Sequence, residues 1–110
     1  MEEEILHLYQ EPGIGASYTN TYGEENIRNL LNKYHSLDDE GMQKMKKMVL
    51  NFSQSTDLAT SFVSVGVLHA LGENEGVADA YRWAKTQEDA QRIISHFEIG
   101  KSVADYFSPG

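Results

Sequence analysis

The chain has 110 residues, and its 17 aspartates and glutamates against 9 lysines and arginines give a formal net charge of −8. That length suits one domain, 1–110, and 40% hydrophobic residues are enough for a packed core. The lack of cysteine excludes a disulfide scaffold, a zinc–thiolate site and a thiol nucleophile, and the acidic balance disfavours attraction to nucleic acid or to an anionic membrane.

The N-terminal segment, about residues 1–23, is rich in loop-forming residues. Residues 5–9 (Ile-Leu-His-Leu-Tyr) fit either a short strand or a first helical turn. Residues 11–23 are rich in glycine, serine, threonine and asparagine, which favour turns. Their tyrosines Tyr18 and Tyr22 either need cover from the domain or form a contact surface. The acidic start is the opposite of a cationic secretory signal, so we expect a cytoplasmic protein.

Two helices are predicted over about residues 21–52. The pattern Thr21-x-x-Glu24 is typical of a capping box, and Ser36-x-x-Asp39 repeats it. Apolar residues follow each signal at helical spacing: Ile27, Leu30, Leu31 and Tyr34 in the first helix, and Leu37, Met45, Met48 and Phe52 in the second. We expect the methionines to belong to the core, although methionine also suits adaptable binding faces.

Residues 34–51 (YHSLDDEGMQKMKKMVLN) are similar to a segment of a known family. They resemble the segment that follows the helix-turn-helix in phage-type repressors, which often reads Tyr-x-x-Leu-Asp-x-x-Gly and then lysine at helical intervals. The resemblance covers about 18 of the 110 residues, and residues 1–33 do not supply the DNA-binding half that would precede it. It implies a bacterial or phage regulatory setting.

Residues 57–71 support two readings. Apolar residues recur at helical spacing, but Val63, Val65 and Val67 also alternate with Ser64 and Gly66 as in a half-buried strand. We favour a buried central helix that ends at Gly72, because its neighbours are helical. The uncharged stretch 58–72 is shorter than the roughly 18 residues that a membrane span requires.

The C-terminal third predicts three further short helices. One covers about residues 77–85, and Thr86-x-x-Asp89 signals the start of the next. Gly100 is expected to end that helix, and residues 103–107 to form the last one. The predicted fold is therefore all-α, a single compact domain of about five or six helices with a possible short N-terminal strand or hairpin.

The sequence offers little support for a catalytic, metal or cofactor site. None of the four histidines, His7, His35, His69 and His96, lies three or four residues from another, so no helix turn offers a pair of metal ligands. The fragment Gly100-Lys101-Ser102 has Ser95 where a phosphate-binding loop needs glycine, and Gly13-x-Gly15 lacks the third glycine of a dinucleotide-binding loop. We expect no enzyme activity, no cofactor and no metal.

Two functions remain. The first is a small acidic protein–protein interaction module, a regulator or inhibitor of phage or mobile-element type that docks on a basic, nucleic-acid-handling protein, without contacting nucleic acid itself. A homodimer is compatible with the same surfaces. The residues expected to contact the partner are Glu2, Glu3, Glu4, Tyr18, Tyr22, Glu73, Glu75 and Asp79. The alternative is a DNA-binding regulator that uses a degenerate helix-turn-helix at 86–107, with its turn at Ile99, or the basic face of Lys44, Lys46 and Lys47.

Overall fold

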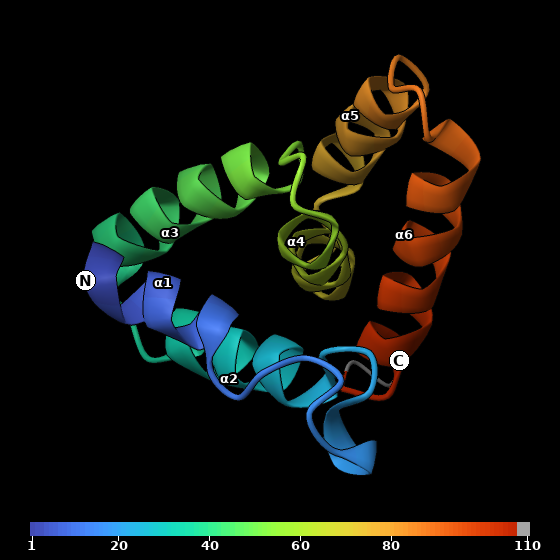
Figure 1. The fold of residues 1–110 in the computed structure, drawn as a ribbon. Helices are drawn as coiled ribbons and strands as arrows, with labels where there is room; N and C mark the ends of the chain where they lie inside the picture. The colour runs from blue at the N-terminus through green and yellow to red at the C-terminus, as the bar shows by residue number, and fades with distance from the viewer. Residues whose placement is uncertain (108–110) are drawn as a thin grey trace.

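A computed structural model describes residues 1–107 (Figure 1). Over these residues the chain forms six α-helices and one 3-10 turn, with no strand. The helices are α1 (Glu2–Gln10), α2 (Glu24–His35), α3 (Asp39–Phe52), α4 (Leu58–Ala70), α5 (Asn74–Ala84) and α6 (Ala90–Asp105), and the turn η1 spans Tyr18–Asn20. The all-α prediction is confirmed. Residues 5–9 belong to a helix, not to a strand or hairpin.

Helix α4 lies at the centre of the molecule, and Figure 1 looks along its axis with the other helices around it. Residues 61–68 are all buried. A helix enclosed on every side needs no polar face, which explains why its sequence also fits a strand. Its two buried serines are satisfied within the helix, since Ser64 Oγ donates to the carbonyl of Thr60 at 2.8 Å and Ser61 Oγ to that of Asp57 at 3.0 Å.

Helices α4 and α6 run parallel and lie against each other through glycine. The rings of Phe62 and His96 are 5.9 Å apart, and farther along the same two helices His69 Nε2 lies 2.8 Å from Asp105 Oδ1. Between these contacts, a Cβ added to Gly66 would lie 2.9 Å from the carbonyl oxygen of Gly100. Only residues without a side chain allow backbones to approach this closely.

The prediction that Gly100 ends a helix is wrong, because α6 continues through it to Asp105. The expected short helix at 103–107 is the last part of α6 and the turn after it. The same observation corrects the helix-turn-helix proposed for 86–107: Ile99 lies inside one uninterrupted helix, so this segment lacks the turn between two helices that the motif requires.

The predicted helix starts need three corrections. Helix α2 begins after Gly23, whose φ of +76° suits glycine, and not after Thr21. The N-cap of α3 is Asp38, which accepts a hydrogen bond from the Gly41 amide at 2.8 Å, and not Ser36. Helix α6 begins after Asp89, and not after Thr86, and the Asp89 side chain makes no capping hydrogen bond.

Two buried asparagines hold the loop of residues 11–23 against the helices. Asn20 Nδ2 donates to Asn26 Oδ1 at 2.8 Å, and Asn20 Oδ1 accepts from the Glu25 amide at 2.9 Å. Asn26 Nδ2 donates to the carbonyls of Leu8 and Pro12, each at 3.0 Å. The pair therefore ties together the end of α1, the loop and the start of α2.

Among the described residues, no helix is both long enough and apolar enough to cross a membrane.

Candidate functional site

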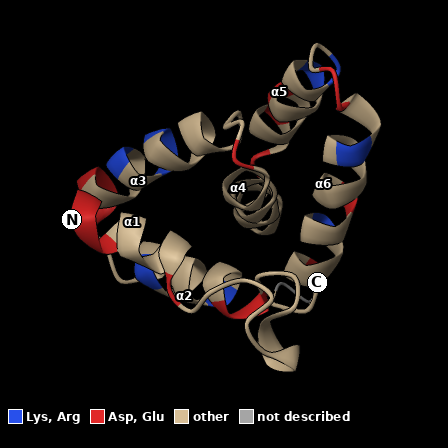
Figure 2. Ribbon diagram, in the orientation of Figure 1, with Lys and Arg blue, Asp and Glu red and all other residues tan. Residues whose placement is uncertain are grey.

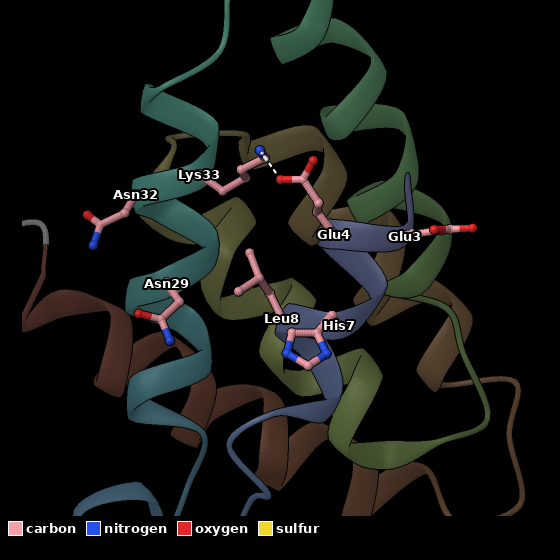
Figure 3. Close-up of a pocket in the computed structure, with 7 residues that line it drawn as sticks. All are labelled: Glu3, Glu4, His7, Leu8, Asn29, Asn32 and Lys33. Atoms are coloured by element: carbon pink, nitrogen blue, oxygen red, sulfur yellow. Dashed lines mark hydrogen bonds and ion pairs between the residues drawn. The ribbon is translucent and has the colours of Figure 1, made fainter. Parts of the chain in front are cut away.

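An open groove of about 670 Å³ lies between α1 and α2 (Figure 3). Its walls come from one face of each helix, and its lining residues are Glu3, Glu4, His7, Leu8, Asn29, Asn32 and Lys33. The Leu8 side chain lies between the two helices, while Glu3 and Asn32 are directed away from each other at the outer rims. The groove thus combines an apolar floor with polar edges, as binding sites in proteins commonly do.

The position of α1 determines the shape of this groove. Ile5 is the fully buried residue that anchors α1 to the core. Near the end of α1, the Tyr9 hydroxyl lies 2.6 Å from Ser64 Oγ of the central helix, and Asn26 of α2 donates to the Leu8 carbonyl. At the start of α1, Glu4 pairs with Lys33 near the end of α2. The two helices are therefore antiparallel and fixed at both ends of the groove.

One of the two carboxylates that line the groove is already neutralised. Lys33 Nζ lies 2.6 Å from Glu4 Oε2, and the hydrogen bond and charge of Lys33 lower the pKa of Glu4. The side chains of Glu3 and of its neighbour Glu2 make no ion pair or hydrogen bond with any residue of the described chain. Figure 2 shows this acidic first turn of α1 at the same corner of the molecule as the acidic first turn of α3. The rim of the groove therefore carries uncompensated negative charge.

Two polar side chains in the groove are also without a partner. The half-buried amide of Asn29 and the exposed imidazole of His7 form no hydrogen bond with other residues in 1–107. In Figure 3 both flank Leu8. A free amide can donate to and accept from a peptide group, so the groove offers hydrogen bonds beside its apolar floor.

The eight residues predicted to contact a partner lie in three separate places. Glu2, Glu3 and Glu4 are in the first turn of α1, whereas Tyr18 and Tyr22 lie in the loop before α2, with 91% and 49% of their surface exposed. Glu73, Glu75 and Asp79 belong to α5 and the residue that precedes it. In Figure 1 these three regions are apart from one another, so the eight residues do not form one patch.

Ion pairs reduce the acidic set further. Glu73 pairs with Lys46 at 2.9 Å, and Asp79 pairs with Arg82. Together with the Glu4–Lys33 pair, these contacts leave Glu2, Glu3 and Glu75 as the predicted acids that have no ion-pair partner within residues 1–107. Of these three, only Glu3 lines the groove.

The basic face considered for DNA is mostly neutralised. Lys44 lies 3.5 Å from Glu40, and Lys46 lies 2.9 Å from Glu73, whose hydrogen bond raises the pKa of Lys46. Only Lys47 of the three has no carboxylate within ion-pair distance among the described residues. One free lysine is a weak attractor for the phosphate backbone.

The histidines do not combine with acids into a metal site. Asp105 contacts His69, and His96 Nδ1 lies 2.8 Å from the carbonyl oxygen of Arg92. Over the part of the chain that the structure describes, no three residues of the histidine, aspartate and glutamate types are grouped to hold a metal ion.

Sequence reasoning missed five residues of the groove: His7, Leu8, Asn29, Asn32 and Lys33. Their only signal is spacing, since Asn29, Asn32 and Lys33 recur at helical intervals on the polar side of α2. That α1 folds back beside this stripe depends on tertiary contacts, chiefly Ile5 and the Asn26–Leu8 hydrogen bond.

In comparisons with known proteins, no family model, no curated protein and no solved structure gives a significant match to this chain.

Proposed function

We propose that this protein is an acidic protein–protein interaction module, a regulator or inhibitor that docks on a basic partner through the groove between α1 and α2. The observation that carries the proposal is the free carboxylate of Glu3 at the rim of an apolar groove. Glu4 beside it is already paired with Lys33, so Glu3 and Glu2 are the charges available to a partner's cation. A cytoplasmic setting of phage or mobile-element type, with a nucleic-acid-handling partner, fits this proposal.

The groove favours a segment that is both apolar and basic. An apolar side chain of the partner would lie on Leu8, and a neighbouring lysine or arginine would reach Glu3. The free amide of Asn29 would bind a peptide group of the segment. An amphipathic helix laid in a groove between helices is a common mode of peptide recognition, and the charge of the rim would speed association.

A synthetic amphipathic peptide of leucine and lysine, fluorescently labelled, tests this proposal by polarisation. We expect binding that weakens as salt rises, because the exposed charges are screened, and shifts of the Leu8 methyl and Asn29 amide signals in NMR spectra. Glu3→Gln should weaken binding several-fold. Glu75→Gln removes an equally unpaired carboxylate from α5 and is the matched control.

Equal loss of affinity in the two variants, or affinity that does not depend on salt, would contradict docking at the groove. A random DNA duplex at low salt is the second probe. Tight binding to the duplex would replace this proposal with a nucleic-acid-binding function, which the charge distribution does not favour.

A further inference from the structure

A second hollow, of about 420 Å³, lies where the α5–α6 connection meets the loop between α3 and α4. Trp83 and Ile93 form its apolar part, and Thr56, Glu88 and Asp89 are among its polar residues. It shares no lining residue with the groove between α1 and α2. In Figure 1 the α5–α6 connection and the N-terminus lie at different corners of the molecule, so the two sites are distinct.

Trp83 is positioned in this hollow by the turn that follows α5. Its carbonyl accepts hydrogen bonds from the Thr86 amide at 3.0 Å and from Thr86 Oγ1 at 2.6 Å, which fold the connection back over the end of the helix. The indole is half-buried, and its N–H meets no acceptor within residues 1–107. The hollow thus has a half-buried aromatic ring in its wall.

Two carboxylates that line the hollow have no side-chain partner among the described residues. Glu88 and Asp89 are exposed and form neither an ion pair nor a hydrogen bond with other described side chains. Asp89 occupies the N-cap of α6 but makes no capping bond, whereas Asp57 at the start of α4 accepts from the Thr60 amide at 3.1 Å. The nearby Lys85 and Arg92 do not pair with either carboxylate. No lysine, arginine or histidine lines the hollow.

We propose that this hollow binds a guanidinium group, as presented by an arginine side chain. A flat cation can stack on an indole face, where the ring attracts it, and its N–H groups can donate to two carboxylates in charge-assisted hydrogen bonds. Guanidinium suits this arrangement better than ammonium because it is planar and more weakly hydrated. The inference goes beyond docking at the groove and does not depend on it.

The chain contains one tryptophan, so the fluorescence of Trp83 reports on this hollow alone. The probe is the blocked peptide acetyl-Gly-Arg-Gly-amide, titrated at constant ionic strength. We expect a saturable change in Trp83 emission, a smaller one with lysine in place of arginine, and none with citrulline, which is similar in shape but uncharged. The indole N–H signal in NMR spectra should shift in parallel.

The double variant Glu88→Gln/Asp89→Asn should bind the arginine peptide at least about tenfold more weakly, because it loses charge-assisted hydrogen bonds. Both residues are exposed, and a thermal melt verifies that the variant keeps its fold. Glu3→Gln is the control and should leave the Trp83 titration unchanged, which separates this site from the groove.

Titration with free methylguanidinium shows whether the hollow recognises a small guanidinium compound or an arginine of a protein partner. Binding as tight as that of the peptide supports recognition of a small guanidinium compound, and tighter binding of the peptide supports an arginine of a protein partner. Equal responses to arginine and citrulline, no saturable response to any guanidinium probe, or full affinity in the double variant would each overturn the proposal.

Discussion

Gly100 lies directly against the carbonyl oxygen of Phe62: a Cβ added to Gly100 would be 2.5 Å from that oxygen. A second close approach lies beside it, because a Cβ added to Gly66 would lie 2.9 Å from the carbonyl oxygen of Gly100. Backbone atoms cannot move aside as the end of a flexible side chain can. Helices α4 and α6 therefore touch through their main chains, and the central contact of the fold depends on two glycines.

Gly100→Ala should destabilise the protein by about 2 kcal/mol, the cost of overpacking a closed interior. A loss of stability would be informative, because replacing glycine by alanine inside an exposed helix ordinarily stabilises a protein by up to about 1 kcal/mol. Urea denaturation measures the free energy of unfolding. Ser102→Ala changes an exposed residue of the same helix and is the control. A neutral or stabilising Gly100→Ala would contradict the close approach of α4 and α6.

Asn26→Ala should cost about 2 kcal/mol, because the carbonyls of Leu8 and Pro12 lose their shared donor and Asn20 loses an acceptor. We also expect faster hydrogen exchange in residues 11–23, which this network holds in place. Asn29→Ala, in the next turn of α2, removes an asparagine with no described partner. If both variants lost the same stability, the hydrogen-bond network would not be the cause.

Stability should fall above pH 10, partly through Tyr9. Burial raises the pKa of Tyr9 well above its ordinary value of 10.0. The unfolded chain therefore releases this proton near pH 10 while the folded chain still holds it. The contribution of Tyr9 to the free energy of unfolding is therefore complete below pH 10. Above pH 10 it declines by at most about 1.4 kcal/mol per pH unit.

Tyr9→Phe should flatten this alkaline decline when unfolding is followed from pH 9 to 11. The variant should also lose about 1 kcal/mol at neutral pH, because its ring no longer bonds to Ser64. Tyr18→Phe replaces a ring that is 91% exposed and is the matched control. An unchanged slope in Tyr9→Phe would show that Tyr9 is not held neutral by burial.

Lys33→Gln should raise the carboxyl pKa of Glu4 towards the ordinary value of 4.5, because the hydrogen bond and charge that lower it are removed. An NMR titration that follows the carboxyl carbon of Glu4 measures this pKa directly. The pair favours the folded state above pH 4.5, and its contribution is lost as the pH falls through the lowered pKa of Glu4. Lys47→Gln, on α3, should leave the Glu4 titration unchanged.

Much of the secondary structure and part of the core follow from the sequence. Helical spacing correctly placed Ile27 and Leu30 in the core, where both are fully buried, and it identified Met45 as a core residue. The buried central helix was also favoured correctly over a strand. Burial on one face places the apolar residues of α2 and α3 at helical spacing, which the sequence shows directly. Helix α4 is buried on all faces, and it was favoured as a helix because its neighbours are helical.

The incorrect predictions concern residues whose role depends on tertiary contacts with distant parts of the chain. Gly100 fits a helix end as well as a close helix contact, and only the position of Phe62 decides between these roles. Thr86 has the residue type of an N-cap, but the helix begins three residues later, after Asp89. The groove could not be predicted because α1 and α2 are joined by a long loop, and nothing local shows that Glu4 meets Lys33.

The enclosure of α4 also has a consequence for synthesis. The ribosome makes this apolar helix before α6, yet part of its cover comes from α6. Until α6 emerges, the side of α4 around Gly66 has no partner to exclude water. A nascent chain that stalls in α5 would therefore present an open apolar surface to chaperones and to other unfinished chains.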